Sequence, residues 1–268
     1  VSNGAIESTG TIDASLFTEH GYTFRLSGIL RGGRAFWDNL DGAGTITGPT
    51  TISSDVSDPG DIVINGAVTL GDDGIDHIIT LNADSNGVGV GVFYMNAGSS
   101  IDGDVNNDGD AYSLVIVSAN SGDNPALTPT LATITEVEDL TLKASTSDPS
   151  KMPVFLASEN LSLYGNLSIG TTSDNEAVLD QNGKTLTLTA GAVFTNYGTL
   201  RLRGTEILNV NFHNDVNHQG TVEYYDPVGP GPIIITMNDY ASLKFSAGAW
   251  LIESDVTIKN NFIVTGND

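Results

Sequence analysis

Residues 186–202 read Leu-Thr-Leu-Thr-Ala-Gly-Ala-Val-Phe-Thr-Asn-Tyr-Gly-Thr-Leu-Arg-Leu, and this stretch decides the fold. Apolar and polar residues alternate at both of its ends, in 186–188 and in 200–202, and glycines lie between the two alternating runs. Alternation of period two predicts β-strands with one buried face, and the residues Gly and Asn between them predict corners. The stretch therefore indicates short strands joined by short turns.

The same alternation recurs along the chain, for example in Ile62–Ile64, Leu114–Ile116 and Leu140–Leu142. Clusters of Gly, Asn, Asp and Ser separate these runs, as turns require. No stretch of ten or more residues keeps the period of a helix, because Gly and β-branched residues interrupt every candidate. We therefore predict an all-β chain.

The short strands recur at a regular interval. Aligned by their first inward apolar residue, they give steps of 26, 21, 25, 22, 25 and 23 residues, and a second series gives 22, 21 and 20. An interval of this size is about one turn of a solenoid made of three short strands, with each coil hydrogen-bonded to the next. We expect the members of each series to stack on one another. The first series is Leu114, Leu140, Leu161, Leu186, Leu208, Ile233 and Val256, and the second is Leu200, Val222, Leu243 and Ile263.

The predicted fold is a right-handed parallel β-helix, also called a β-solenoid. A β-sandwich or jelly roll is the alternative, since Asp-Gly at 73–74 and Asn-Gly at 182–183 are typical of tight hairpins. Residues 1–45 hold three of the five arginines and several aromatic residues, so we expect an atypical amino-terminal cap or assembly segment there. Residues 46–268 are assigned to the coils, which are clearest from residue 110.

The charge of the chain limits its partners. Thirty-three acidic residues against ten basic ones give a net charge of −23, which repels nucleic acid and anionic lipid surfaces. Cysteine is absent, which excludes disulfides and thiolate metal sites. No run of about 18 apolar residues occurs, so we expect no membrane insertion by this segment. Because the first residue is Val1 rather than Met, we expect a processed protein or an excerpt from a longer one.

Residues 102–110 read Asp-Gly-Asp-Val-Asn-Asn-Asp-Gly-Asp and match the first half of a calcium loop. Side-chain oxygens at alternate positions, followed by a glycine for a sharp turn, suit a hard cation. The pattern then fails, because the twelfth position counted from Asp104 is Val115, where an EF-hand has a bidentate Glu. A corner whose side chains cap their own backbone is the alternative. The candidate calcium ligands are Asp104, Asn106, Asp108 and Asp110.

Catalysis is not predicted. Enzymes with a β-helix fold cleave polysaccharides with two or three carboxylates on one face of the coils, and nothing in the sequence places such a set in one cleft. Arg201 and Arg203 are the alternating basic pair of the coil region, and a solvent-facing strand produces the same alternation. The acidic residues that could meet in an active site are Glu136, Glu138, Asp139 and Glu159.

Two phrases carry a resemblance to a known class. Residues 160–170, Asn-Leu-Ser-Leu-Tyr-Gly-Asn-Leu-Ser-Ile-Gly, and residues 186–202 resemble coils of bacterial β-helical adhesins of the filamentous-haemagglutinin and autotransporter-passenger class. The resemblance covers mainly residues 110–268 and is one of composition. It implies export and a cell-surface role in adhesion or assembly. The chain departs from that class in lacking the Asn-Pro-Asn motifs of its secretion domain and a translocator barrel.

These observations together predict a noncatalytic extracellular protein with a structural or adhesive role at the cell surface. It would be an adhesin segment or a subunit of a filament or surface layer, with calcium as a stabilising ion. The expected partners are copies of itself, neighbouring surface proteins, and glycans. The alternative is a polysaccharide lyase, hydrolase or tailspike-like depolymerase on the same fold.

Overall fold

A computed structural model covers residues 1–268. Backbone and side chains are described for residues 61–64, 67–68, 70, 77–84, 91–104, 111–120, 128–148, 150–171, 176–210, 220–225, 239–248, 250–252 and 255–265. Backbone alone is described for the strands within residues 1–60, for residues 69 and 149, and for 233–235.

The described chain is all-β, which confirms the sequence prediction. It forms strands of two to six residues, and its helical structure is limited to one 3-10 turn at Pro149–Lys151, where Asp148 caps the first turn. No helix of the described residues is long and apolar enough to cross a membrane. Three sheets hold most of the strands, and every pairing within them is parallel. A sandwich or jelly roll is built from antiparallel strands, so that alternative does not fit these sheets.

The first sheet consists, in spatial order, of β7 (Gly44–Ile46), β10 (Ala67–Leu70), β13 (Ser100–Asp102), β16 (Thr133–Val137), β19 (Leu161–Leu163), β22 (Leu186–Leu188) and β25 (Leu208–Asn209). The second sheet consists of β2 (Thr11–Ala14), β5 (Ile29–Gly32), β8 (Thr50–Ser54), β11 (Ile78–Asn82), β14 (Ser113–Ser118), β17 (Leu140–Ala144), β20 (Leu167–Ile169) and β23 (Phe194–Asn196). The third sheet consists of β3 (Phe17–His20), β6 (Ala35–Asp38), β9 (Ile62–Ile64), β12 (Phe93–Met95), β15 (Thr130–Leu131), β18 (Val154–Ala157), β21 (Val178–Asp180), β24 (Thr199–Leu202), β26 (Thr221–Tyr224), β29 (Ser242–Phe245) and β32 (Phe262–Val264). Three two-stranded sheets pair β1 (Ile6–Ser8) with β4 (Phe24–Leu26), β27 (Ile233–Ile235) with β30 (Trp250–Ile252), and β28 (Asp239–Tyr240) with β31 (Thr257–Ile258).

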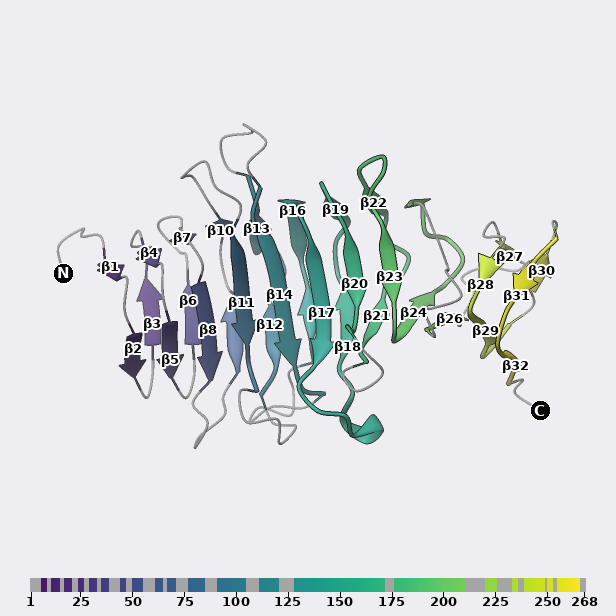
Figure 1. Cartoon of the computed structure of the whole chain (residues 1–268), viewed down its shortest axis with the longest axis horizontal. Helices are drawn as coiled ribbons and strands as arrows, with labels where there is room; N and C mark the ends of the chain where they lie inside the picture. Colours follow the sequence, from purple (N-terminus) through teal and green to yellow (C-terminus); the bar gives the residue numbers. More distant parts are fainter. Residues whose placement is uncertain are drawn as a thin grey trace.

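The chain visits the three sheets in rotation. Strands β16, β17 and β18 lie in the first, second and third sheets, and β19 returns to the first sheet beside β16. Figure 1 shows the strands side by side along the long axis, with the two termini at opposite ends. The second and third sheets continue, as backbone, into residues 11–38. The predicted boundary at residue 45 depends on side chains that lie outside the described residues, and it stays a prediction.

The predicted stacking of the first series is right in part. Leu114 pairs with Leu140 in the second sheet, as expected. Leu140 then pairs with Leu167, not with Leu161. Leu161 instead belongs to a separate column in the first sheet, where it follows Ile134 and is followed by Leu186 and Leu208. The error arose because one coil holds two nearly identical strands six residues apart, Leu-Ser-Leu at 161–163 and Leu-Ser-Ile at 167–169, and a repeat interval alone does not distinguish them.

The ends of both series also differ from the prediction. Ile233 pairs with Trp250 rather than continuing from Leu208, and Val256 precedes β31 instead of lying in a strand. Leu243 pairs with Phe262, not with Ile263. A shift by one residue moves a side chain to the opposite face of its sheet. The run Phe-Ile-Val at 262–264 is apolar at every position, so alternation could not decide which residue continues the column.

A single apolar core receives side chains from all three sheets. Leu161 of the first sheet, Leu140 of the second and Phe155 of the third belong to the same cluster of buried residues, and each is fully inaccessible to solvent. Burial of apolar surface on this scale is the main favourable contribution to folding. The core follows the direction in which the coils stack and extends from Ile62 to Phe245.

Polar side chains at the corners connect one coil to the next. The carboxylate oxygen Oδ1 of Asp139 accepts a hydrogen bond from the Asn166 backbone N–H at 2.7 Å. The amide oxygen of Asn166 accepts in turn from the Val193 N–H, also at 2.7 Å. At another corner the amide oxygen of Asn160 accepts from the Thr185 N–H at 2.9 Å. These side chains satisfy backbone donors that the turns leave without a strand partner.

Glycine is required where a corner lies directly against the coil before it. A Cβ atom added at Gly198 would lie 2.0 Å from the carbonyl oxygen of Ala177. We expect Gly198→Ala to lower the free energy of unfolding by about 2 kcal/mol, because the backbone must move to relieve the overlap. Denaturant titration followed by circular dichroism would measure the loss.

Gly191→Ala is the control for backbone strain. Its added Cβ meets no atom within 4 Å, but its φ of 98° is unfavourable for alanine. We expect a loss of about 1 kcal/mol from that conformation alone. A loss at Gly198 no larger than the loss at Gly191 would contradict the close packing of successive corners.

Candidate functional site

The carboxyl-terminal end of the stack is the main apolar surface of the described residues. Five of the eight exposed large hydrophobic residues in the described chain belong to its last coil, β30 to β32. Three of them, Ile252, Phe262 and Val264, line one hollow, whereas Leu251 and Ile263 alternate to the other face of their strands. We call this surface the open end. Its five residues are Leu251, Ile252, Phe262, Ile263 and Val264.

The open end is where two columns of core residues reach the last described strand of the third sheet, β32. Two columns of stacked residues cross the third sheet, and their members are buried as far as β29. The next residues along the columns, Phe262 and Val264 of β32, are 56% and 64% exposed. Neighbouring strands cover a core residue from both sides, whereas β32 has a partner, β29, on one side only. One column is Leu179, Leu200, Val222, Leu243 and Phe262, and the other is Leu202, Tyr224, Phe245 and Val264.

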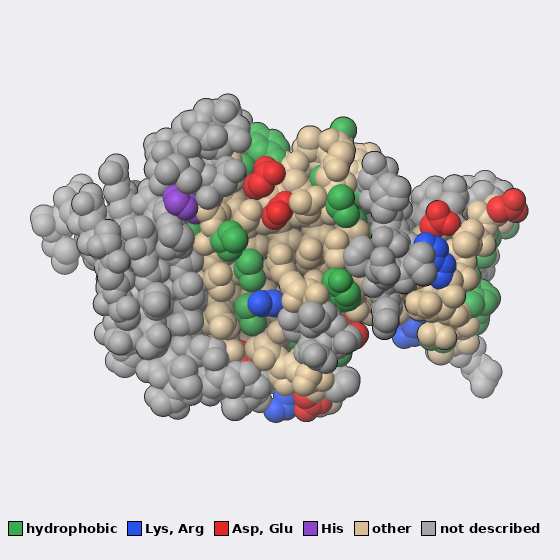
Figure 2. All heavy atoms as spheres, in the orientation of Figure 1, with side chains coloured by type: hydrophobic (Ala, Val, Ile, Leu, Met, Phe, Trp, Pro, Cys, Tyr) green, Lys and Arg blue, Asp and Glu red, His purple; other side chains and the backbone are tan. Residues whose placement is uncertain are grey.

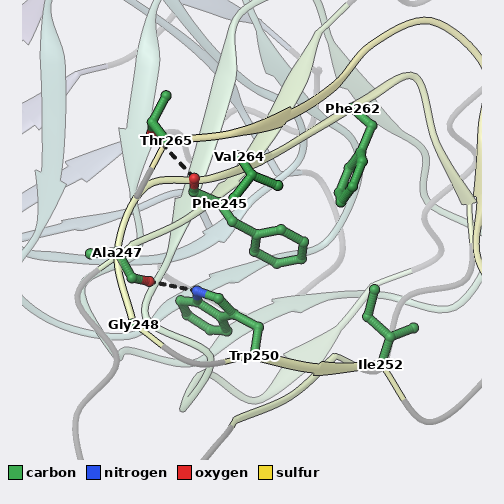
Figure 3. Close-up of a pocket in the computed structure, with 8 residues that line it drawn as sticks. All are labelled: Phe245, Ala247, Gly248, Trp250, Ile252, Phe262, Val264 and Thr265. Atoms are coloured by element: carbon green, nitrogen blue, oxygen red, sulfur yellow. Dashed lines mark hydrogen bonds between the residues drawn. The ribbon is translucent and has the colours of Figure 1, made fainter. Parts of the chain in front are cut away.

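A hollow of about 460 Å³ lies in the open end. The rings of Phe245 and Trp250 form its floor, with centroids 5.7 Å apart and planes inclined by 27°. Phe262 contacts Phe245 edge to face at a centroid distance of 5.8 Å. Figure 3 shows the three rings around the hollow, with Ile252 and Val264 on its wall. Tilted and edge-to-face ring pairs are the favourable arrangements for aromatic side chains.

The polar groups of this lining are already bonded. Trp250 Nε1 donates to the carbonyl oxygen of Ala247 at 2.5 Å, and the Thr265 hydroxyl donates to that of Phe245 at 3.2 Å (Figure 3). A sugar site combines aromatic surface with polar groups that converge on the ligand hydroxyls. The hollow offers the rings without such a set, so its chemistry suits an apolar occupant.

A second feature lies on the outer face of the third sheet, where charges alternate over four successive strands. We call it the charge ladder. It consists of four residues on successive strands, each paired in register with the next. Arg201 Nη1 lies 3.2 Å from Asp180 Oδ2, and Arg201 Nε lies 3.3 Å from Glu223 Oε2. Lys244 Nζ lies 2.9 Å from Glu223 Oε1. The ladder is Asp180 on β21, Arg201 on β24, Glu223 on β26 and Lys244 on β29.

The surroundings of the ladder favour the charged form of Glu223. Burial raises the pKa of Glu223, but hydrogen bonds from Ser246 and Lys244 and the charges of Lys244 and Arg201 outweigh it, so the pKa lies below its ordinary value of 4.5. Burial and the Asp180 carboxylate raise the pKa of Tyr225 to about 12. Tyr225 therefore stays protonated at neutral pH and donates its hydroxyl proton to Asp180. Two acidic and two basic groups neutralise one another in the ladder.

Aromatic contact strengthens the ladder. The Arg201 guanidinium carbon lies 4.0 Å from the ring centroid of Tyr225, a cation–π distance. This geometry explains why the basic pair at Arg201 and Arg203 interrupts an otherwise acidic chain. Arg201 connects three neighbouring side chains, Asp180, Glu223 and Tyr225.

The structure describes one of the four predicted calcium ligands. Asp104 is buried at the end of the segment that follows β13, and its backbone N–H donates to Asp102 Oδ1 at 3.3 Å. Asn106, Asp108 and Asp110 lie outside the described residues. Among the residues that are described, no group of three or more His, Cys, Asp or Glu side chains is placed to hold a metal ion. Calcium binding stays a prediction.

Three of the four acidic residues considered for catalysis, Asp139, Glu159 and Glu136, have separate side-chain partners. Asp139 accepts from the Asn166 backbone, and Glu159 lies 3.8 Å from Lys184 Nζ. Glu136 occupies the bulge of β16 with a left-handed φ of 58°, a conformation that sequence reasoning did not anticipate. Burial and a hydrogen bond to Glu136 raise the pKa of Tyr164, the residue that faces the bulge from the next coil.

Charged side chains do not form one patch on the visible face. Figure 2 shows acidic and basic side chains dispersed over the described surface, and apolar side chains both over the middle of the molecule and at the carboxyl-terminal end. No protein-family model matches the chain, and no curated protein or solved structure matches it either.

Proposed function

We propose that the chain is a noncatalytic extracellular module with a structural or adhesive role, an adhesin segment or a subunit of a filament or surface layer. Its three sheets would close around the shared core into a right-handed parallel β-helix. The observation that carries the proposal is the regular parallel stack of strands, whose three sheets contribute to one apolar core. A stack of this kind can extend by adding coils.

The connectivity of the strands supports closure and a right-handed path. Successive strands enter the three sheets in fixed rotation, and one core takes residues from each sheet. Three sheets that share one core are most simply arranged around it. A connection between parallel strands of one sheet is right-handed in nearly all proteins, which supports a right-handed path.

Two further observations support a noncatalytic role. The charged groups of the ladder are engaged with one another, and the acids of the coil region are engaged at separate corners. A net charge of −23 keeps a long exposed surface soluble and disfavours nucleic acid and anionic lipid as partners. The partners that we propose are copies of the chain, neighbouring surface proteins, and glycans at the outer surface of the cell.

The test combines imaging, binding and degradation. Negative-stain microscopy should show rods or filaments, and arrays of cell-surface glycans should identify any adhesive ligand. The same preparation, incubated with acidic and neutral polysaccharides, should release no oligosaccharides from them. Release of oligosaccharides by a preparation that neither assembles nor binds would contradict the proposal.

One observation favours the alternative of a polysaccharide-degrading enzyme. Asp180 and Glu223 lie two strands apart on the same sheet face, on either side of Arg201. Strands two apart are separated by about 9.6 Å, close to the spacing of the acid and base in inverting glycosidases. Both carboxylates are already engaged with cations, which suits a structural ladder better than a proton donor. Asp180→Asn would abolish polysaccharide cleavage if the alternative holds.

Calcium forms part of the proposal through Asp104, Asn106, Asp108 and Asp110. The residue types suit calcium, because side-chain oxygens at alternate positions are the ligands that this hard cation prefers. A cation that binds only the folded chain stabilises it by mass action. We expect the melting temperature to fall by several degrees, on the order of 5 °C, when a chelator replaces millimolar calcium. Asp108→Asn should reduce that difference, and an unchanged melting temperature would contradict calcium binding.

A further inference from the structure

The Asn182–Gly183 pair makes a corner between two sheets, not the hairpin that Asn-Gly commonly forms. It lies between β21 of the third sheet and β22 of the first, and both residues have a left-handed backbone, with φ of 49° and 78°. The Lys184 N–H donates to the carbonyl oxygen of Gln181 at 2.8 Å, which closes the turn. Gly183 is exposed and Asn182 is half-buried, so water reaches the pair.

An Asn-Gly pair is able to react with itself. The backbone nitrogen of the glycine attacks the side-chain carbonyl carbon Cγ of the asparagine, and a new Cγ–N bond forms. Ammonia leaves with the side-chain nitrogen and the proton of the glycine N–H. Water then opens the cyclic succinimide to aspartate or isoaspartate, which adds a negative charge. Glycine favours the attack because it has no Cβ to obstruct the approach of its nitrogen.

We propose that Asn182 is a latent deamidation site, and that the corners stacked on either side of it keep it unreacted. The corner at residues 158–160 precedes it in the stack, and the corner at residues 203–207 follows it. Each of these corners also leads from the third sheet to the first. Neither the reaction nor its suppression depends on the structural or adhesive role of the chain.

The following corner holds the nitrogen that would attack. The Gly183 N–H donates to Glu206 Oε1 at 2.9 Å. The same carboxylate accepts from the backbone N–H groups of Arg203 and Gly204, both at 2.7 Å, and these bonds fix its position. A hydrogen bond to a carboxylate is stronger than one to a neutral acceptor, and a negative charge beside the nitrogen disfavours the loss of its proton. Glu206 therefore opposes the step that turns this nitrogen into a nucleophile.

The preceding coil holds the side chain that would be attacked. Asn182 Nδ2 donates to the carbonyl oxygen of Ala157 at 3.4 Å, and the Asn182 backbone N–H donates to Asp180 Oδ1 at 3.0 Å. The side-chain amide is thus bonded to the coil before, and the Gly183 N–H to the coil after. A reaction within one chain needs the two groups close together and aligned. The stack directs them to opposite neighbours.

Deamidation would disturb the stack that prevents it. An aspartate formed from Asn182 would add a negative charge to a corner that already holds Asp180 and Glu206. Isoaspartate would also lengthen the main chain by one carbon between β21 and β22, strands that are paired in register with both neighbouring coils. A change of register moves side chains to the wrong face of a sheet. Reaction at this corner is therefore expected to loosen the coils around it.

Peptide mapping by mass spectrometry provides the first test. The folded chain and the chain in denaturant would be incubated in the same mildly alkaline buffer, and conversion of Asn182 to aspartate and isoaspartate would be followed over time. Asn182 in the folded chain should react at least about tenfold more slowly, as expected where a hydrogen bond to a charged group must first break. Equal rates in the folded and denatured chains would overturn the proposal.

Glu206→Ala tests the carboxylate separately from the turn. In the folded variant, Asn182 should recover most of the difference in rate between the folded and denatured chains. Glu206→Gln, which keeps an acceptor without the charge, should react at an intermediate rate. Glu159→Gln is the matched control, because Glu159 lies 3.8 Å from Lys184 Nζ and its loss leaves the bond between Glu206 and Gly183 in place. No acceleration in Glu206→Ala, or the same acceleration in Glu159→Gln, would contradict the role of Glu206.

Leu140→Ala separates local protection from general unfolding. Opening of the whole chain would also release Asn182, and this variant weakens the core without touching the corner. Under conditions where circular dichroism shows every variant folded, Leu140→Ala should deamidate at the rate of the original chain. If Leu140→Ala reacted as fast as Glu206→Ala, general unfolding would govern the reaction, and protection by the neighbouring corners would be wrong.

Discussion

Leu140→Ala is expected to lower the free energy of unfolding by about 3–5 kcal/mol, the largest effect of any single change that we propose. Leu140 is fully buried and lies between Leu114 and Leu167 in the second sheet. Alanine would leave a cavity that the coils on either side could not fill without moving their strands. Guanidinium titration followed by circular dichroism and by tryptophan fluorescence would measure the loss.

Leu251→Ala is the matched control for this truncation. It removes the same atoms from a residue of the open end that is 41% exposed, so we expect a loss below about 1 kcal/mol at protein concentrations where the chain is a monomer. Similar losses at Leu140 and Leu251 would contradict a core enclosed by the three sheets. Stacked repeats can unfold in more than one step, so both optical signals should be compared before a single free energy is derived.

Glu223→Gln is expected to lower the free energy of unfolding by about 3 kcal/mol at neutral pH, because it leaves two cations without their shared carboxylate. Glu223 is largely buried and contacts both Arg201 and Lys244. The charge ladder would then hold two positive groups and one negative group on a half-buried face. Denaturant titration at pH 7 would measure the difference from the original chain.

The same variant should alter the dependence of stability on pH. The folded state holds the pKa of Glu223 below its ordinary value of 4.5. The stability that Glu223 contributes is thus fully present above that ordinary value and is lost as the pH falls through the lower folded-state pKa. Titrations between pH 2 and pH 7 should show the original chain and Glu223→Gln converging in acid. A constant difference over that whole range would contradict the role of the charged carboxylate.

Glu159→Gln provides the control for an exposed ion pair. Glu159 and Lys184 are 3.8 Å apart, and both side chains are substantially exposed. Surface pairs of this kind contribute about 0–1 kcal/mol, so we expect little change in stability. A large effect here and a small one at Glu223 would invert the expected order and show that burial does not govern these interactions.

The ladder and the open end have one physical origin. In a parallel stack each residue acquires the equivalent residue of the next coil as a neighbour, so a column can alternate in charge or remain apolar throughout. The ladder ends inside the stack at Lys244, whose partner on β32 is Ile263. The apolar columns continue to Phe262 and Val264 and reach the surface there. Addition of another coil would therefore be favoured by apolar contact more than by charge.

The amino-acid sequence by itself determined the all-β class of the fold and, where apolar and polar residues alternate, the side of the strand that faces the core. Alternation in segments such as Leu186–Leu188 and Leu200–Leu202 is local, and it predicts strands whatever surrounds them. The interval between repeats also followed from the sequence, because each coil needs the same number of strands and corners. The residue types of the calcium loop were visible too, although three of the four proposed ligands lie outside the described residues.

Only the tertiary structure decided which coil residues lie side by side. Corners of different length separate the strands, so Leu140 could be followed by Leu161 or by Leu167 with equal support from the repeat, and backbone pairing selects Leu167. The same pairing places Arg201 between Asp180 and Glu223, residues about 20 positions away on either side. Exposure of Phe262 likewise depends on whether another strand covers it, a property of the whole stack that no local pattern records.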